Sequence, residues 1–90
     1  LEGARLLMKV LPSPRMRVII EDEPAEFAAK GNNVFAKFVV DSDPEIRPGD
    51  DVIVVNTKDE LAAVGRALMN RDEMFAFKRG LAVRVKDSPD

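Results

Sequence analysis

Short apolar blocks alternate with proline-rich and glycine-rich turns along this chain, and the first blocks predict a helix and a strand. Residues 5–11 suit a short helix, which Pro12 and Pro14 end because proline disfavours helix at the preceding residue. Residues 16–20 (MRVII) are rich in β-branched side chains and predict a strand. The folded unit is therefore expected to begin at residue 16.

A second helix is predicted to open at Glu23 and Pro24, since proline suits the first helical position. Gly31 follows as a left-handed helix stop, a position that glycine occupies without steric cost. Phe27 and Ala28 are expected to face the core.

Two buried strands are expected next. Residues 34–40 (VFAKFVV) are apolar on both faces apart from Lys37, which predicts a central strand buried on both sides. Pro48 and Gly49 occupy the two middle positions of a predicted type II turn. That turn leads into residues 51–55 (DVIVV), the second of these strands.

Residues 61–69 are ambiguous, because leucine, alanine and methionine favour helix whereas Gly65 weakens it by roughly 1 kcal/mol relative to alanine. Two neighbouring features favour a strand. Residues 57–60 resemble a hairpin loop, and Asn70 with Glu73 forms the signature of a fresh helix start. We therefore predict a strand over residues 61–69.

A short helix over residues 71–78, closed by Gly80, then leads into the last strand, residues 81–86. Strand geometry places its side chains on two faces, with Leu81, Val83 and Val85 on one and Ala82, Arg84 and Lys86 on the other. Five strands and two short helices in the folded unit predict a mainly β fold, a compact and nearly closed barrel.

The charge is unevenly distributed, although the net charge is only -2. Residues 41–60 carry seven acidic and two basic side chains, whereas residues 74–86 carry four basic and no acidic ones. With 90 residues the chain can bury a single core, so one domain is expected. The bulk charge argues against coating nucleic acid, but a basic strip remains.

The composition excludes most enzymatic chemistry, because the chain contains neither cysteine nor histidine. Asp41, Asp43 and Glu45 have calcium-loop spacing, but Ile46 and Val52 replace the required glycine and glutamate. We expect no catalytic residue, metal or cofactor. No apolar run could cross a bilayer and no signal peptide is recognisable, so a cytoplasmic location without membrane contact is expected.

The basic strip consists of Lys78, Arg79, Arg84 and Lys86, and it could track a polyphosphate. Two structural readings stay open. Cations near a helix C-terminus complement the helix dipole, and cations on a strand protect a sheet edge.

The turn at Gly31, Asn32 and Asn33 is likewise open to two readings. It is either a simple helix stop or a place where a ligand backbone can approach closely. Lys37 suggests a position at the barrel rim, and Phe35 beside it is expected in the core rather than as a stacking surface for bases.

Three stretches together resemble the PUA domain, an RNA-binding fold of RNA-modification enzymes. They are "IRPGDDVIVV", "AVGRALM" with its internal Gly65, and "FKRGLAVRV". Within that family the chain is most similar to the C-terminal domain of archaeal tRNA-guanine transglycosylases and related archaeosine-forming enzymes, on the stretch "NVFAKFVVDSDPEIRP". The resemblance covers residues 16–86. The expected organisation is a helical segment and linker (1–15), the PUA domain (16–87) and a short tail (88–90).

The resemblance implies a PUA-like mixed-strand pseudobarrel of about six strands that binds structured RNA, such as the acceptor stem and 3′ end of a tRNA. The matching RNA-binding positions are Gly31, Asn32, Asn33, Lys37, Arg79, Gly80, Arg84 and Lys86. The catalytic domain of a parent enzyme is the expected protein partner, because Leu1 is not a methionine and the chain resembles a segment of something larger. The alternatives are a protein-interaction barrel and a stand-alone, ribosome-associated PUA protein.

Overall fold

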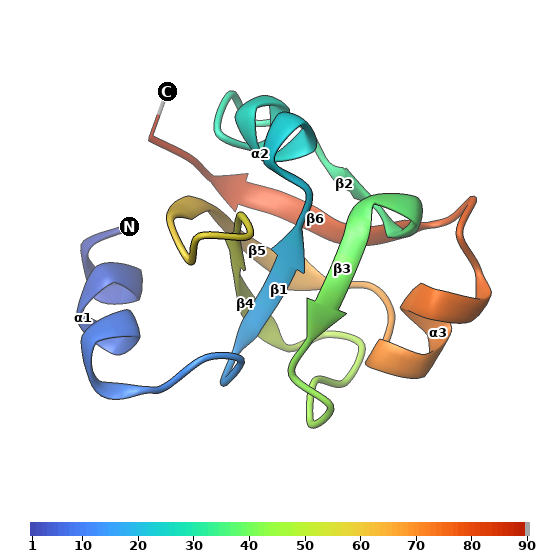
Figure 1. Ribbon diagram of the computed structural model, residues 1–90, viewed down its shortest axis with the longest axis horizontal. Coiled ribbons are helices and arrows are strands. Elements are labelled where there is room, and N and C mark those ends of the chain that lie inside the picture. Colours follow the sequence, from blue (N-terminus) through green and yellow to red (C-terminus); the bar gives the residue numbers. More distant parts are fainter. Residues whose placement is uncertain (90) are drawn as a thin grey trace.

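The computed structural model describes residues 1–89, and Figure 1 shows their arrangement. This part of the chain forms three α-helices, one 3-10 helix and six strands. None of these helices is long and apolar enough to cross a membrane. The elements are α1 (Glu2–Val10), β1 (Arg17–Ile20), α2 (Asp22–Ala28), β2 (Val34–Phe35), η1 (Ala36–Phe38), β3 (Val39–Ser42), β4 (Asp51–Val55), β5 (Leu61–Ala67), α3 (Arg71–Ala76) and β6 (Leu81–Asp87).

All described strands belong to one mixed sheet with the order β2-β6-β5-β4-β1-β3. The β1–β4 pair is parallel and the other neighbouring pairs are antiparallel. The two edge strands, β2 and β3, are joined by η1 alone, so the sheet curls until its edges almost meet (Figure 1). This confirms the predicted PUA-like pseudobarrel.

The core lies on the inner face of this curled sheet. Val18, Val54 and Val83 are among its fully buried strand residues. Ala28 from α2 and Met74 from α3 extend the same cluster. The two helices therefore complete a core that the strands alone would leave open.

Several local predictions are confirmed. Gly49 has φ +97°, and the Asp50 amide donates to the Arg47 carbonyl, as a type II turn requires. Asn70 and Glu73 form a reciprocal capping box at the start of α3. Residues 61–67 are a strand rather than a helix.

The predicted central strand over residues 34–40 is wrong. The 3-10 turn η1 divides it into β2 and β3, which occupy the two opposite edges of the sheet. Apolar side chains on both faces indicated burial on both faces, but Phe35 is 44% exposed and Val40 is 49% exposed. The sheet thus has six strands instead of five, as the family resemblance implied.

Two expectations about α2 also need correction. The helix begins at Asp22, so Pro24 is its third residue rather than its first. Ala28 is buried as expected, but Phe27 is 54% exposed. Ala25 and Ala28 form the inward face of this short helix, and Phe27 therefore points elsewhere.

Helix α1 packs against the outer face of the sheet. Ala4 and Met8 contact a cluster that includes Ile53, Val55 and Val64. The N-terminal amino group of Leu1 lies 3.7 Å from Asp87 Oδ2, so the two ends of the described chain approach each other. The predicted N-terminal helical segment is thus folded onto the domain.

Candidate nucleic-acid interface

The turn after α2 lies beside the second half of β6. Gly31 has φ +99°, and a Cβ built on it would lie 3.8 Å from Ser88 Oγ. Asn33 Oδ1 accepts a hydrogen bond of 2.9 Å from the Val85 amide. Arg84 is exposed on the same stretch of β6. The glycine turn and this strand cation therefore occupy one flank of the molecule.

Lys37, Arg79 and Gly80 lie together near the first residues of β6. The Lys37 amide donates to the Lys78 carbonyl at 3.1 Å, and the Ala36 amide donates to the Gly80 carbonyl at 2.8 Å. A Cβ on Gly80 would collide with the end of the Met69 side chain. A side chain at Gly80 would therefore displace the end of Met69. The predicted site residues divide into two groups, at the two ends of β6.

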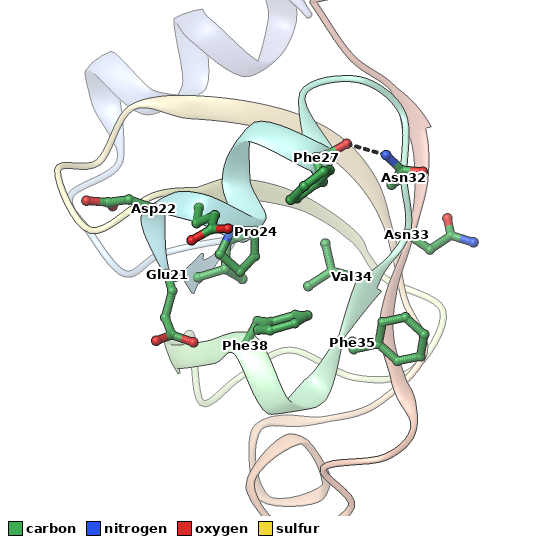
Figure 2. A pocket seen from close by; sticks show the side chains of 11 residues that line it. Glu21, Asp22, Pro24, Phe27, Asn32, Asn33, Val34, Phe35 and Phe38 are labelled. Atoms are coloured by element: carbon green, nitrogen blue, oxygen red, sulfur yellow. Dashed lines mark hydrogen bonds between the residues drawn. The ribbon is translucent and has the colours of Figure 1, made fainter.

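An apolar groove of about 950 Å³ opens between α2, β2 and η1 (Figure 2). Phe27, Val34 and Phe38 line it, and Phe35 lies at its edge. Lys37 Nζ lies 5.1 Å from the centroid of the Phe38 ring and 6.0 Å from that of Phe35. The sequence did not predict this groove, because Phe27 and Phe35 were expected to lie in the core.

The opposite end of the groove is acidic, with carboxylates from Glu21, Asp22 and Glu23. Asp22 Oδ1 accepts hydrogen bonds from the Thr57 hydroxyl at 2.7 Å and from its amide at 3.1 Å. The hydroxyl bond, followed by the amide bond, holds the pKa of Asp22 below its ordinary value of 3.8. Asp22 therefore stays ionised at neutral pH, and this end of the groove disfavours phosphate.

Replacing Thr57 with valine should raise the pKa of Asp22, because it removes the stronger of these hydrogen bonds. The depressed pKa means that ionised Asp22 stabilises the fold above its ordinary pKa, a contribution lost as the pH falls through the lowered value. A ¹³C titration of the Asp22 carboxyl group in both proteins measures the change. An unchanged titration midpoint would contradict the role of the hydroxyl.

Two asparagines of the predicted site serve mainly to hold the turn. Asn32 Nδ2 donates to the Phe27 carbonyl at 3.0 Å (Figure 2). Asn33 Oδ1 accepts from the Val85 amide of β6, as described. Lys86 Nζ lies 3.5 Å from Asp51 Oδ1, so this cation is partly neutralised. Arg66 on β5 is not among the predicted site residues, and it lies directly opposite Arg84 on β6.

The acidic loop after β3 has structural contacts. Asp43 is buried, and its two carboxylate oxygens accept from the Met16 and Glu45 amides at 2.8 and 2.9 Å. Asp41 Oδ1 accepts from Arg71 Nε at 3.0 Å. Across residues 1–89, no group of three or more acidic side chains is arranged so that it could hold a metal ion.

A sequence profile of the PUA domain matches residues 16–88. The chain belongs to the PUA domain family. PUA domains are RNA-binding modules, and the resemblance seen in "IRPGDDVIVV" and its neighbouring motifs is confirmed.

Relatives place this PUA domain among RNA-modification enzymes. It is 55% identical over 86 residues to the tRNA-guanine(15) transglycosylase of Thermococcus kodakarensis and 57% identical to that of Pyrococcus abyssi. Each match covers 96% of this chain but 15% of the relative, so the chain corresponds to an accessory part of such an enzyme.

Solved structures agree with this assignment. A conserved PUA domain protein from Thermoplasma acidophilum is 35% identical with a TM-score of 0.83, covering 94% of this chain and 56% of that protein. A protein of the archaeal box H/ACA Nop10-Cbf5 complex is 33% identical with a TM-score of 0.76, covering 80% of this chain and 23% of its own.

Proposed function

We propose that this PUA domain binds the acceptor stem and 3′ end of a tRNA and positions it for the catalytic domain of a tRNA-guanine transglycosylase. The supporting observation is the shared flank of the Gly31 turn and Arg84, held together by the bond between Asn33 and Val85. The names of the relatives supply the substrate class.

The stem would lie against the β6 flank. An RNA duplex offers a wide, shallow minor groove of 2′-hydroxyls flanked by phosphates, which favours recognition by shape and backbone contacts. Gly31 carries no side chain and lets the backbone of the turn approach such a surface. Arg84 supplies a guanidinium that can bind a phosphate through two hydrogen bonds.

The unpaired 3′ nucleotides would enter the groove between α2, β2 and η1. Exposed phenyl rings stack on any base, at roughly 1–3 kcal/mol per base. Lys37 at the rim would attract the phosphates of this strand, and the carboxylates at the far end would repel them. The last nucleotide of the 3′ end carries no phosphate beyond it, so it can lie at the acidic end of the groove.

Binding to two hairpin RNAs, with and without an unpaired 3′ extension, tests both halves of the proposal. Phe35→Ala should weaken binding of the extended RNA about tenfold and leave the blunt RNA unaffected, because stacking needs an unpaired base. Arg84→Glu should weaken binding of both RNAs, as measured by fluorescence anisotropy.

Phe75→Ala is the matched control, since Phe75 is exposed on α3 and does not line the groove. Equal losses for Phe35→Ala and Phe75→Ala would remove the groove from the proposal. Amide signals of Gly31 and Arg84 that stay unmoved when RNA is added would refute the β6 flank.

A protein-interaction barrel is the second candidate, favoured by the outward face of α1. Leu6 and Val10 are 59% and 73% exposed on a helix whose opposite face already packs on the sheet. Reversing Arg84 and Lys86 to glutamate separates the candidates. An interaction module should keep its protein partner, whereas an RNA-binding module should lose its RNA.

A further inference from the structure

The outer face of the sheet is divided between an apolar half under α1 and an exposed charged half. On the charged half, Arg66 is the cross-strand partner of both Asp51 on β4 and Arg84 on β6. Residues directly opposite each other across strands present their side chains on the same face. Asp51, Arg66 and Arg84 therefore form one row across three strands.

The position of Arg66 opposite Arg84 is unfavourable for the stability of the sheet. Like charges directly opposite each other destabilise a sheet. Within residues 1–89 no carboxylate forms an ion pair with Arg66 or Arg84, and the Asp51 carboxylate lies 3.5 Å from Lys86 Nζ instead. Protection of a sheet edge does not account for Arg66, because β5 is an internal strand.

We propose that Arg66 and Arg84 together bind one backbone phosphate of an RNA duplex. This inference rests on the proposed function and adds a residue that lies outside the predicted site. Directly opposed residues have Cβ atoms roughly 4.5–5.5 Å apart, so two guanidinium groups can converge on one phosphate. Each guanidinium offers a planar pair of donors, and a bound anion would remove the repulsion between the cations.

The position of Arg84 links this site to the rest of the interface. The Gly31 turn borders one side of the second half of β6, and Arg66 lies on the other side. RNA held at the turn and at Arg84 would continue over β5 to Arg66. The footprint thus extends from the edge of the sheet onto an internal strand, and it ends at the negative charge of Asp51.

Measuring the affinity for a blunt RNA hairpin at several salt concentrations tests the proposal. Arg66→Gln and Arg84→Gln should each weaken binding about three- to tenfold and reduce the slope of log K against log salt by roughly one. The double variant should weaken binding by less than the product of the two single effects, because both side chains hold the same phosphate. Arg47→Gln is the matched control, as Arg47 is exposed on the loop before β4.

The midpoint of thermal unfolding distinguishes RNA binding by Arg66 from a purely structural role of this side chain. The midpoint of Arg66→Gln should stay unchanged or rise, since removal of one arginine relieves the repulsion. If Arg66→Gln binds RNA like Arg47→Gln while Arg84→Gln loses affinity, the inference fails and the proposed function stands. If neither Arg66→Gln nor Arg84→Gln loses affinity, or the unaltered protein does not bind the hairpin, both fail.

Discussion

Replacing Arg17 with methionine should destabilise the protein by about 3 kcal/mol and release α1 from the sheet. The backbone carbonyls and the carboxylate that the buried guanidinium now binds would lose their partner. Arg17 is 1% exposed. Its Nη1 donates to the Leu11 and Arg15 carbonyls at 2.9 and 3.1 Å, and Nη2 donates to the Met8 carbonyl at 3.2 Å. Its Nε lies 2.8 Å from Asp59 Oδ1, an ion pair to the hairpin between β4 and β5.

The carbonyls of Met8 and Leu11 are at the C-terminal end of α1, where helical carbonyls lack partners within the helix. A nine-residue helix is marginal in water without tertiary contacts. Urea unfolding measures the loss of stability, and hydrogen exchange of the α1 amides measures undocking. If those amides keep their protection in Arg17→Met, the guanidinium does not hold the helix.

Two further variants separate the contributions of Arg17. Arg15→Met removes an exposed cation nearby and should change the free energy of unfolding by less than about 0.5 kcal/mol. Asp59→Asn keeps the positive φ of 61°, which asparagine tolerates, but removes the ion pair. Its cost should be about 1 kcal/mol or less, because Asp59 is 44% exposed.

Gly65→Ala should lower the free energy of unfolding by about 3 kcal/mol, at the upper end of typical overpacking costs. A Cβ at Gly65 would overlap the Arg84 carbonyl oxygen and lie 2.9 Å from Val83 Cγ1. The first of these is a backbone atom that cannot rotate away, and the strand register is irregular at this point. β5 and β6 would therefore have to separate where Arg66 faces Arg84.

Gly3→Ala is the control for the Gly65 variant. A Cβ at Gly3 meets no atom within 4 Å, and alanine favours helix, so this variant should be slightly stabilised. Comparing the thermal midpoints of both variants tests the argument. A Gly65→Ala midpoint equal to that of the unaltered protein would show that the strands adjust without cost.

The net charge of -2 conceals a separation of acidic and basic side chains on the folded protein, and the proposed RNA-binding surface relies on that separation. Glu21, Asp22 and Glu23 gather at one end of the groove, while Arg66 and Arg84 face outward from β5 and β6. The basic strip was visible in the sequence, but the position of Arg66 opposite Arg84 was not. Arg66 belongs to a stretch of mostly apolar residues, and only the folded structure shows that it lies opposite Arg84 on the neighbouring strand.

Local features of the sequence were read correctly where a few neighbouring residues decide the structure. The turn at Gly49 and the capping box at Asn70 depend on backbone conformation and short-range hydrogen bonds. Residues 61–69 were assigned to a strand because the cap at Asn70 excluded a continuous helix, and the strand β5 covers Leu61–Ala67 of that range.

The incorrect prediction of one strand over residues 34–40 arose because neighbouring residues alone do not decide the structure there. Apolar side chains on both faces predict burial only if both faces are covered, and the pattern does not show what covers them. The chain turns at η1 and leaves Phe35 on the surface of a groove. Sequence pattern thus identified the apolar residues but not their environment.

By itself the sequence determined the family and the order of most elements, because motifs and periodicity are properties of neighbouring residues. Only the tertiary structure decided that Arg17 holds α1, that the phenyl rings line a groove and that Arg66 faces Arg84. Each of these depends on how separate elements of the fold pack together in three dimensions. The pattern of apolar and polar residues along the chain does not specify that packing.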